Sequence, residues 1–289
     1  MTDTRQKLIE DLQLRGFAET TVIQYLGAAS VFLRYHNAQS PADLSSQDVR
    51  RFLLHLAQLG RAPATRAVYY AGLKFFFESL GRPEVMRDIP RPRAQTQDPG
   101  RALTRPEARA LLDLLAPCPI DYTFFALMLA TGLRISEAAA LQVDDIDRRA
   151  SLLHVRRGKG SKPRSVMLSA PTLRMLERYW RAVRPRAPFL FPAQFSGRGV
   201  RTSGEGRWSD RPISSGRMAQ RLKLRQGDVP RRVRSHDLRR TFATWLIEDG
   251  YDLRLVQVLL GHASPETTAR YTRIHADVIA HTRSPFDML

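Results

Sequence analysis

A proline-rich, polar segment divides this chain into two parts that have to fold around separate cores. Residues 89–101, IPRPRAQTQDPGR, contain three prolines and no recurring apolar position. Proline lacks a backbone donor and restricts the residue before it, so neither a helix nor a central strand can run through such a segment. The composition is typical of an interdomain linker. It predicts one domain over residues 1–88 and a second over residues 102–289, both of ordinary size.

The first domain has the pattern of consecutive helices separated by glycine and proline. In the second of them apolar residues recur at steps of three and four, as at Val22, Leu26 and Ala29, which places them on one buried face. This pattern predicts a small helical bundle. The expected helices cover Thr4 to Arg15, Glu19 to His36, Ser46 to Leu59 and Thr65 to Leu80.

The second domain combines further helices with one hairpin. Two β-prone runs, residues 151–157 and 164–168, flank the turn-forming sequence GKGSKP, which predicts antiparallel strands joined by a mobile tip. The expected fold class is therefore mainly α with a small antiparallel β-sheet (α+β).

Capping residues mark the helices of the second domain. Thr104, followed by Pro106 and Glu107, predicts a helix start. Near the other end, Ser235 is expected to cap a helix that runs to Asp249.

The rest of the second domain is predicted to hold a short helix, a loop and a tail. Leu253 to Leu260 is expected to form a short helix that Gly261 stops. The Gly-, Ser- and Arg-rich residues 195–216 indicate a solvated loop able to order on DNA, and residues 283–289 a loose tail.

Basic residues outnumber acidic ones by 46 to 28, and the excess is uneven. Residues 1–99 hold 13 basic and 10 acidic residues, a net +3, which leaves +15 of the total +18 for the rest of the chain. So large a charge indicates a polyanionic partner. Nucleic acid is favoured over a membrane surface because no basic amphipathic helix is evident.

Several classes of protein are disfavoured by what the sequence contains. The single cysteine, Cys118, permits no internal disulfide and no cysteine-based zinc site, and it fits a reducing compartment. The longest apolar run, Phe124 to Leu133, is about half of the ~20 residues that a membrane span needs. No H-E-x-x-H, P-loop or G-x-G-x-x-G motif is present. We therefore expect a soluble, cytoplasmic, nucleoid-associated protein that works without a metal or nucleotide cofactor.

Cationic and imidazole side chains gather in short motifs at the edges of the predicted elements. Displacement at a phosphodiester builds negative charge on the non-bridging oxygens, and preorganised donors there contribute roughly 2.7–4 kcal/mol each. Planar guanidinium groups fit that geometry best. The motif residues are Arg134 in TGLRISE, Lys159 in GKGSKPR, His236 and Arg239 in HDLRRTFAT, and His262 in LLGHAS.

Taken singly, each of these residues has an ordinary explanation. Lys159 alone would be a solvated turn lysine and Arg134 a surface arginine at a helix end. Tyr271 shares the apolar side of its predicted helix and alone would be a core tyrosine.

Together, however, the motifs resemble the tyrosine recombinase, or phage integrase, family and its Xer-like members over nearly the whole chain. TGLRISE resembles the first arginine box of the family, GKGSKPR its lysine hairpin, HDLRRTFAT its H-x-x-R box, and LLGHASPETTARYT its closing histidine and tyrosine. All six catalytic positions of the family are matched in order. The resemblance implies a helical, SAM-like core-binding domain followed by a catalytic domain.

The resemblance also implies how the residues would act on double-stranded DNA. By this resemblance Arg134 and Arg239 would bind the phosphate, with Glu137 supporting Arg134, and His236 and His262 would donate hydrogen bonds to it. Tyr271 would attack to give a 3′-phosphotyrosine. Lys159 would protonate the leaving 5′-oxygen. Lys162 and Arg164, beside Lys159 in the basic hairpin, are the further candidate DNA contacts. Four protomers, identical or of two kinds, would hold two recombination sites.

Two other functions fit parts of the pattern. A non-cleaving DNA-binding accessory protein of a mobile element would keep the charge, although the full set of six residues argues against it. A topoisomerase-like nicking and closing enzyme would use the same chemistry. The target sequence, the choice among integration, excision, chromosome resolution and transposition, and any partner recombinase are left open by the sequence.

Overall fold

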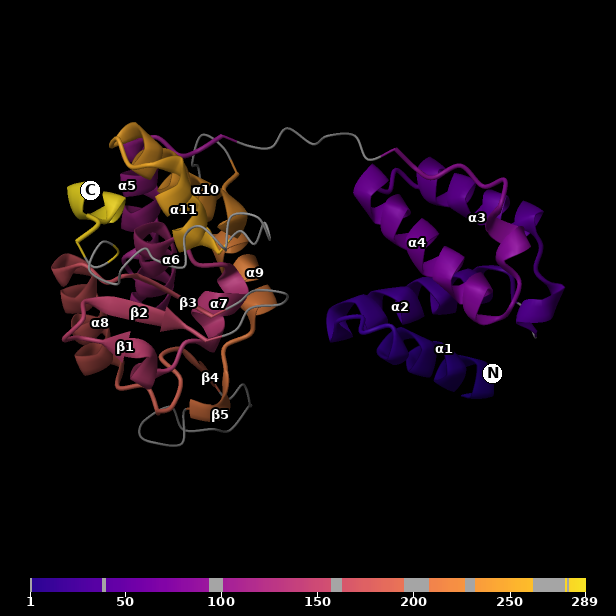
Figure 1. Cartoon of the computed structure of the whole chain (residues 1–289), viewed down its shortest axis with the longest axis horizontal. Helices are drawn as coiled ribbons and strands as arrows, with labels where there is room; N and C mark the ends of the chain where they lie inside the picture. The colour runs from indigo at the N-terminus through magenta and orange to yellow at the C-terminus, as the bar shows by residue number, and fades with distance from the viewer. Residues whose placement is uncertain are drawn as a thin grey trace. The chain divides into compact units, whose positions relative to one another are not determined.

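The computed structural model describes residues 2–37, 40–93, 101–156, 163–194, 208–226, 232–261, 279 and 281–289. The chain forms two compact units, Met1–Pro99 and Gly100–Leu289 (Figure 1). The boundary between them lies in the proline-rich segment 89–101. Helices predominate in both units, with small antiparallel sheets in the second, which confirms the predicted fold class.

The first unit is a bundle whose four α-helices confirm the predicted ones to within two residues at each end. They are α1 (Thr2–Leu14), α2 (Glu19–Tyr35), α3 (Ser46–Gln58) and α4 (Pro63–Ser79), with the short 3₁₀ turns η1 (Pro41–Asp43) and η2 (Pro83–Met86). Helix α4 contacts each of the other three. It begins two residues earlier than expected because Pro63 occupies its first turn, where a missing N–H costs nothing.

Aromatic rings fill the core of the first unit. Phe32 and Phe52 are at most 1% exposed, and their ring centroids lie 5.3 Å apart in an edge-to-face arrangement. At Gly72 of α4 an added Cβ would come within 2.8 Å of the Cβ of Ala28, so glycine permits the close approach of α2 and α4. Ile89, in the predicted linker, is only 5% exposed and belongs to this core. The packed part of the first unit therefore extends past residue 88.

The second unit is built around α6, and its elements follow in chain order. The first are α5 (Arg105–Leu115), α6 (Pro119–Thr131), α7 (Ile135–Ala140), η3 (Val143–Asp145), β1 (Ile146–Asp147), β2 (Leu152–Val155), β3 (Arg164–Met167) and α8 (Ala170–Val183). The rest are β4 (Pro192–Gln194), β5 (Trp208–Pro212), α9 (Ser215–Arg225), α10 (Ser235–Glu248), α11 (Leu253–Leu260) and η5 (Pro285–Met288). None of the described helices is long and apolar enough to cross a membrane.

Helix α6 holds most of the long apolar run noted in the sequence. Every residue from Phe124 to Thr131 is at most 1% exposed. The helix contacts α5, α8 and α10, which cover it from different sides (Figure 1). A helix that is apolar all round must be buried all round. The run is therefore the core of the second unit.

The predicted hairpin is present as β2 and β3. They pair antiparallel, with Leu153 opposite Val166, and β1 adds a third strand on the far side of β2. The tip of the hairpin, residues 157–162, lies outside the described residues.

Part of the predicted loop over residues 195–216 is ordered structure instead. Residues 208–212 form β5, which pairs with β4, and α9 begins at Ser215. The prediction was wrong there because it took no account of Trp208, a large apolar side chain that packs into the core. It is 4% exposed and belongs to the core of the second unit. A single buried aromatic residue leaves no periodic pattern to read.

The predicted loose tail was also wrong. The Oγ of Ser284 is buried and donates to the carbonyl of Ala130 over 2.8 Å, and the Oγ of Ser169 donates to Asp287 over 2.6 Å. Arg109 on α5 donates to the carbonyl of Leu289. Phe286 and Leu289 also pack against the core, and the distant partners of this segment are not visible in the sequence.

Helix caps fix where the site-bearing elements begin. Thr104 caps α5 as predicted, through a reciprocal box with Glu107. In α10 the cap is Arg234 rather than Ser235, because the carboxylate of Asp237 accepts the Arg234 backbone N–H over 2.9 Å. Farther along this helix, Trp245 is 2% exposed and donates from Nε1 to the carbonyl of Leu103 over 3.1 Å.

A buried carboxylate joins α6 to α9. The side chain of Asp121 is fully buried, and the Nε atoms of Arg221 and Arg225, one helical turn apart on α9, approach its two oxygens. Arg221 also contacts the Sγ of Cys118 at 3.1 Å. The single cysteine is thus part of this packing contact.

Replacing Asp121 by asparagine is expected to lower the free energy of unfolding by about 2–3 kcal/mol. Breaking a fully buried ion pair costs about 3–5 kcal/mol, and the partial exposure of both arginines reduces that figure. Urea denaturation followed by circular dichroism measures the change, with the exposed Asp144→Asn as a matched control. A loss no greater than that of the control would contradict the prediction.

Candidate active site

Arg134 is placed by the sharp end of α6. Gly132 has a φ of +66°, and a Cβ at this position would lie 2.3 Å from the ring of Phe242 on α10. Both the left-handed backbone and the close contact require glycine. The chain then turns back, Leu133 is buried, and Arg134 becomes the N-cap residue of α7.

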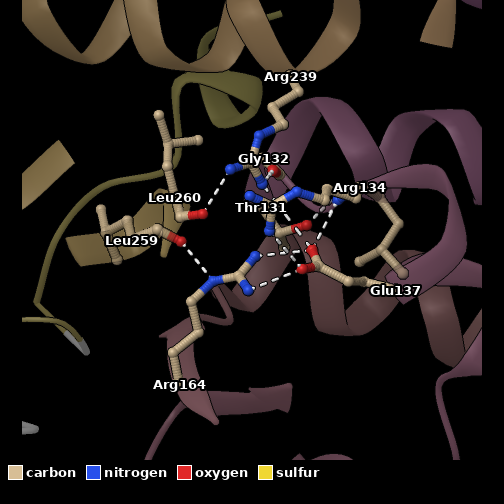
Figure 2. Close-up of polar contacts among 9 residues, drawn as sticks. Thr131, Gly132, Arg134, Glu137, Arg164, Arg239, Leu259 and Leu260 are labelled. Carbon is tan, nitrogen blue, oxygen red and sulfur yellow. Dashed lines mark hydrogen bonds and ion pairs between the residues drawn. The ribbon is translucent and has the colours of Figure 1, made fainter. Parts of the chain in front are cut away.

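Glu137 is the anionic centre of the site (Figure 2). Its side chain is fully buried and accepts hydrogen bonds from the backbone N–H and the Nη1 of Arg134, each over 2.8 Å. It also accepts two from Arg164, over 2.9 and 2.8 Å. Burial alone would raise the pKa of Glu137, but the hydrogen bonds from both arginines lower it to about 2. Glu137 is therefore ionised at any physiological pH.

Arg239 reaches the same cluster from α10. Its side chain is 4% exposed, and its Nη1 donates to the carbonyl of Gly132 over 2.8 Å. Its Nη2 donates to the carbonyl of Leu260, and its Nη1 lies 3.9 Å from the Oε2 of Glu137 (Figure 2). Burial and the neighbouring charges of Arg134 and Arg164 lower its pKa to about 10, so its guanidinium stays protonated at neutral pH.

Arg164 lies inside this cluster. Its side chain is 6% exposed, and all three of its guanidinium nitrogens are engaged by Glu137 and by the carbonyl of Leu259. A DNA contact at Arg164 stays a prediction, and the nitrogens that would bind phosphate are engaged within the protein here. The basic hairpin motif gave no sign of this inward direction.

His236 lies in the first turn of the same helix, three residues before Arg239. Partial burial lowers its pKa, and the charges of Arg239 and Arg240 lower it further against the opposing effect of Asp237. The neutral imidazole is therefore favoured at physiological pH. A neutral imidazole carries one N–H to donate and one lone pair to accept a proton.

The cluster as a whole carries an excess of positive charge. Three guanidinium groups surround one carboxylate, and Arg134 is the most exposed of the three, with 36% of its side chain accessible. A fixed positive excess with an accessible guanidinium favours a bound anion. The structure thus brings together Arg134, Glu137 and Arg239. Lys159, Lys162, His262 and Tyr271 lie outside the described residues.

The sequence did not indicate that backbone carbonyls take part. Those of Gly132, Leu259 and Leu260 hold Arg239 and Arg164 in place. The available signal was the pair of glycines, Gly132 and Gly261, since glycine at a helix end often marks a close approach. At Gly261 an added Cβ would lie 2.9 Å from the Cδ of Arg164.

Comparison with known proteins identifies the family. Residues 101–277 match the model of the phage integrase family, and residues 4–85 match that of the phage integrase N-terminal SAM-like domain. A Sinorhizobium fredii protein named "Putative integrase/recombinase y4qK" is 35% identical over 295 residues, 100% of this chain and 90% of that protein. Tyrosine recombinase XerA of Pyrococcus furiosus is 30% identical over 277 residues, 94% of this chain and 91% of that protein.

A solved structure extends the likeness to the fold. The lambda integrase chain in a dimer bound to a COC′ core site matches with a TM-score of 0.69 at 16% identity, covering 94% of each chain. The family model covers more than half of the chain, and relatives at least 30% identical align along nearly all of it. This chain therefore belongs to the phage integrase family and is a tyrosine-type site-specific recombinase.

Proposed function

We propose that this chain cleaves and rejoins double-stranded DNA through a 3′-phosphotyrosine formed on Tyr271. The observation that carries the proposal is the cluster of Arg134, Arg164 and Arg239 around the buried Glu137, which has a net positive charge and in which the Arg134 side chain is partly exposed. Such a cluster suits a phosphodiester, whose non-bridging oxygens gain negative charge as the phosphorus is attacked.

In the proposed reaction the phenol oxygen of Tyr271 bonds to phosphorus as the bond to the 5′-oxygen breaks. Arg134 and Arg239 bind the non-bridging oxygens. Lys159 protonates the leaving 5′-oxygen, and neutral His236 accepts the phenol proton while its N–H, together with that of His262, donates to the phosphate. The phosphotyrosine retains the energy of the broken bond, so rejoining a strand needs no nucleotide.

We further propose that the two parts of the chain have different roles. Residues 102–289 contain all six groups of the reaction and most of the positive charge, while residues 1–88 help to hold the duplex. The proposed assembly on DNA is a tetramer that holds two recombination sites. Its four protomers are copies of this chain, or of this chain and a related one. Solved relatives support this assembly: a lambda integrase dimer is bound to a core site and a lambda integrase tetramer to a Holliday junction.

Trapping the covalent intermediate tests the proposal. A binding site is first selected from random duplexes that the protein retains, and a nick is then placed close to the cleaved position so that the short fragment diffuses away. The protein should become attached to the remaining strand through its 3′ end, and EDTA should leave the yield unchanged.

Mass spectrometry of the digested adduct identifies the attached residue, which should be Tyr271. Attachment through a 5′ end, or through any other residue, would refute the mechanism. Two selected sites on one circular DNA then separate recombination from nicking and closing. A recombinase excises or inverts the segment between the two sites, whereas a nicking and closing enzyme only relaxes supercoils.

A further inference from the structure

Arg164 connects three elements that are distant in the sequence. It is the first residue of β3, at the base of the hairpin, and its Nη1 and Nη2 bind the two oxygens of Glu137 on α7 over 2.9 and 2.8 Å. Its Nε donates to the carbonyl of Leu259 on α11 over 2.8 Å (Figure 2). A planar guanidinium with a fixed fork can make these three bonds at once.

The end of α11 is held by two arginines of the site. The last carbonyls of a helix have no partner within it. Here the carbonyl of Leu259 binds Arg164, and that of Leu260 binds Arg239. Gly261 follows with a φ of +64°, and its Cα lies against the side chain of Arg164, so that a Cβ would approach the Cδ to 2.9 Å and Nη1 to 3.1 Å. The next residue in the chain is His262.

We infer that Arg164 is a positioning residue for phosphoryl transfer, which fixes Glu137 and the end of α11 and thereby sets Arg134 and Arg239 relative to each other. This inference rests on the proposed function. It differs from the DNA contact that the basic hairpin suggested for Arg164.

The charges explain why Arg164 affects the other two arginines. Among the groups that lower the pKa of Glu137, Arg164 is the strongest, acting against the burial that raises it. Without Arg164, only Arg134 and Arg239 remain to neutralise the carboxylate of Glu137. The carboxylate then attracts their guanidinium groups toward itself. A lysine at position 164 restores the charge, but its compact ammonium lacks the planar fork that binds both oxygens of Glu137 and the carbonyl of Leu259. The substitution Arg164→Lys therefore changes the geometry of the contacts while keeping the charge.

The test compares Arg164→Lys with the parent on the selected duplex. Single-turnover cleavage is followed at rising DNA concentrations, so that the rate at saturation is separated from the affinity. The rate at saturation should fall on the order of 10²-fold, the effect of misplacing a transition-state donor. The affinity for DNA should change by less than about threefold, since Arg164 is too buried to contribute a phosphate contact to binding.

A second substrate distinguishes positioning from a general structural defect. One non-bridging oxygen of the scissile phosphate is replaced by a methyl group, so that the phosphorus centre is neutral and depends less on the arginines. On this methylphosphonate the deficit of Arg164→Lys should shrink at least tenfold. The matched control is Arg221→Lys, which alters another arginine paired with a buried carboxylate, Asp121, away from the site. It should leave both substrates within about threefold of the parent.

Three outcomes would overturn the inference: a parental cleavage rate in folded Arg164→Lys, an equal deficit on both substrates, or a deficit of the same size in Arg221→Lys. If Arg164→Lys does not fold, Gly261→Ala disturbs the same contact from the other side and should show the same pattern. A parental rate in folded Gly261→Ala would then overturn it. The proposed function fails separately, when the parent itself forms no adduct on Tyr271.

Discussion

Replacing Tyr271 by phenylalanine is expected to abolish covalent attachment to DNA while site DNA is bound with the affinity of the parent. The substitution removes one oxygen atom, so it deletes the nucleophile and changes little else. A phenol with a pKa of about 10 is mostly protonated at neutral pH, and it attacks only when a cationic cluster and a proton acceptor assist it. Arg134, Arg239 and His236 supply that assistance in the proposed mechanism.

The measurement uses the nicked duplex, denaturing electrophoresis and a parallel binding assay. Tyr251→Phe is the matched control, because the hydroxyl of Tyr251 accepts a hydrogen bond from the backbone of Arg283 over 2.9 Å and so has a structural contact of its own. It should form the adduct at a rate close to that of the parent. A covalent complex in Tyr271→Phe would eliminate Tyr271 as the nucleophile.

The second large effect is expected at Arg239. Alanine at this position should lower the rate of single-turnover cleavage by about 10²–10³-fold at saturating DNA, the size of effect found when one preorganised donor is removed from a transition state. Lysine should recover little of it, because an ammonium cannot donate to the carbonyls of Gly132 and Leu260 and also present a fork to phosphate. Circular dichroism has to show that both variants are folded, since the lost bonds are buried.

Arg105→Ala is the control for Arg239. Arg105 contacts the other end of α10, where it pairs with Asp249 at 3.0 Å and lies over the ring of Trp245. Its loss should lower stability without a specific loss of cleavage. Equal cleavage defects in folded Arg105→Ala and Arg239→Ala would mean that α10 is merely loosened, and Arg239 would lose its assigned role.

Local signals made most of the fold predictable. Glycine and proline breaks with apolar periodicity predicted the four helices of the first unit, Thr104 with Glu107 predicted the start of α5, and the two β-prone runs predicted β2 and β3. These signals act over a few residues, within one element or one turn. Trp208 and Ser284 were misread because their burial depends on partners that lie far away in the sequence.

The motifs named the residues of the candidate site but did not indicate the contacts among them. The motifs indicated Arg134, Glu137 and Arg239, and the structure places these three in one cluster. The direction of the Arg164 side chain could not be read, because a basic hairpin suits a solvated arginine as well as a buried one. Only the proximity of Glu137 and the end of α11, set by tertiary packing, decides between them.

The packing of Trp208 and Trp245 also offers an optical probe of one unit. The chain has three tryptophans, at positions 180, 208 and 245, and all of them belong to the second unit. Two are at least 95% buried, so their emission should move to longer wavelength when that unit unfolds. The first unit contributes tyrosine emission only. Tryptophan fluorescence, excited where tyrosine absorbs little, therefore reports the unfolding of the second unit, and far-ultraviolet circular dichroism reports that of the whole chain.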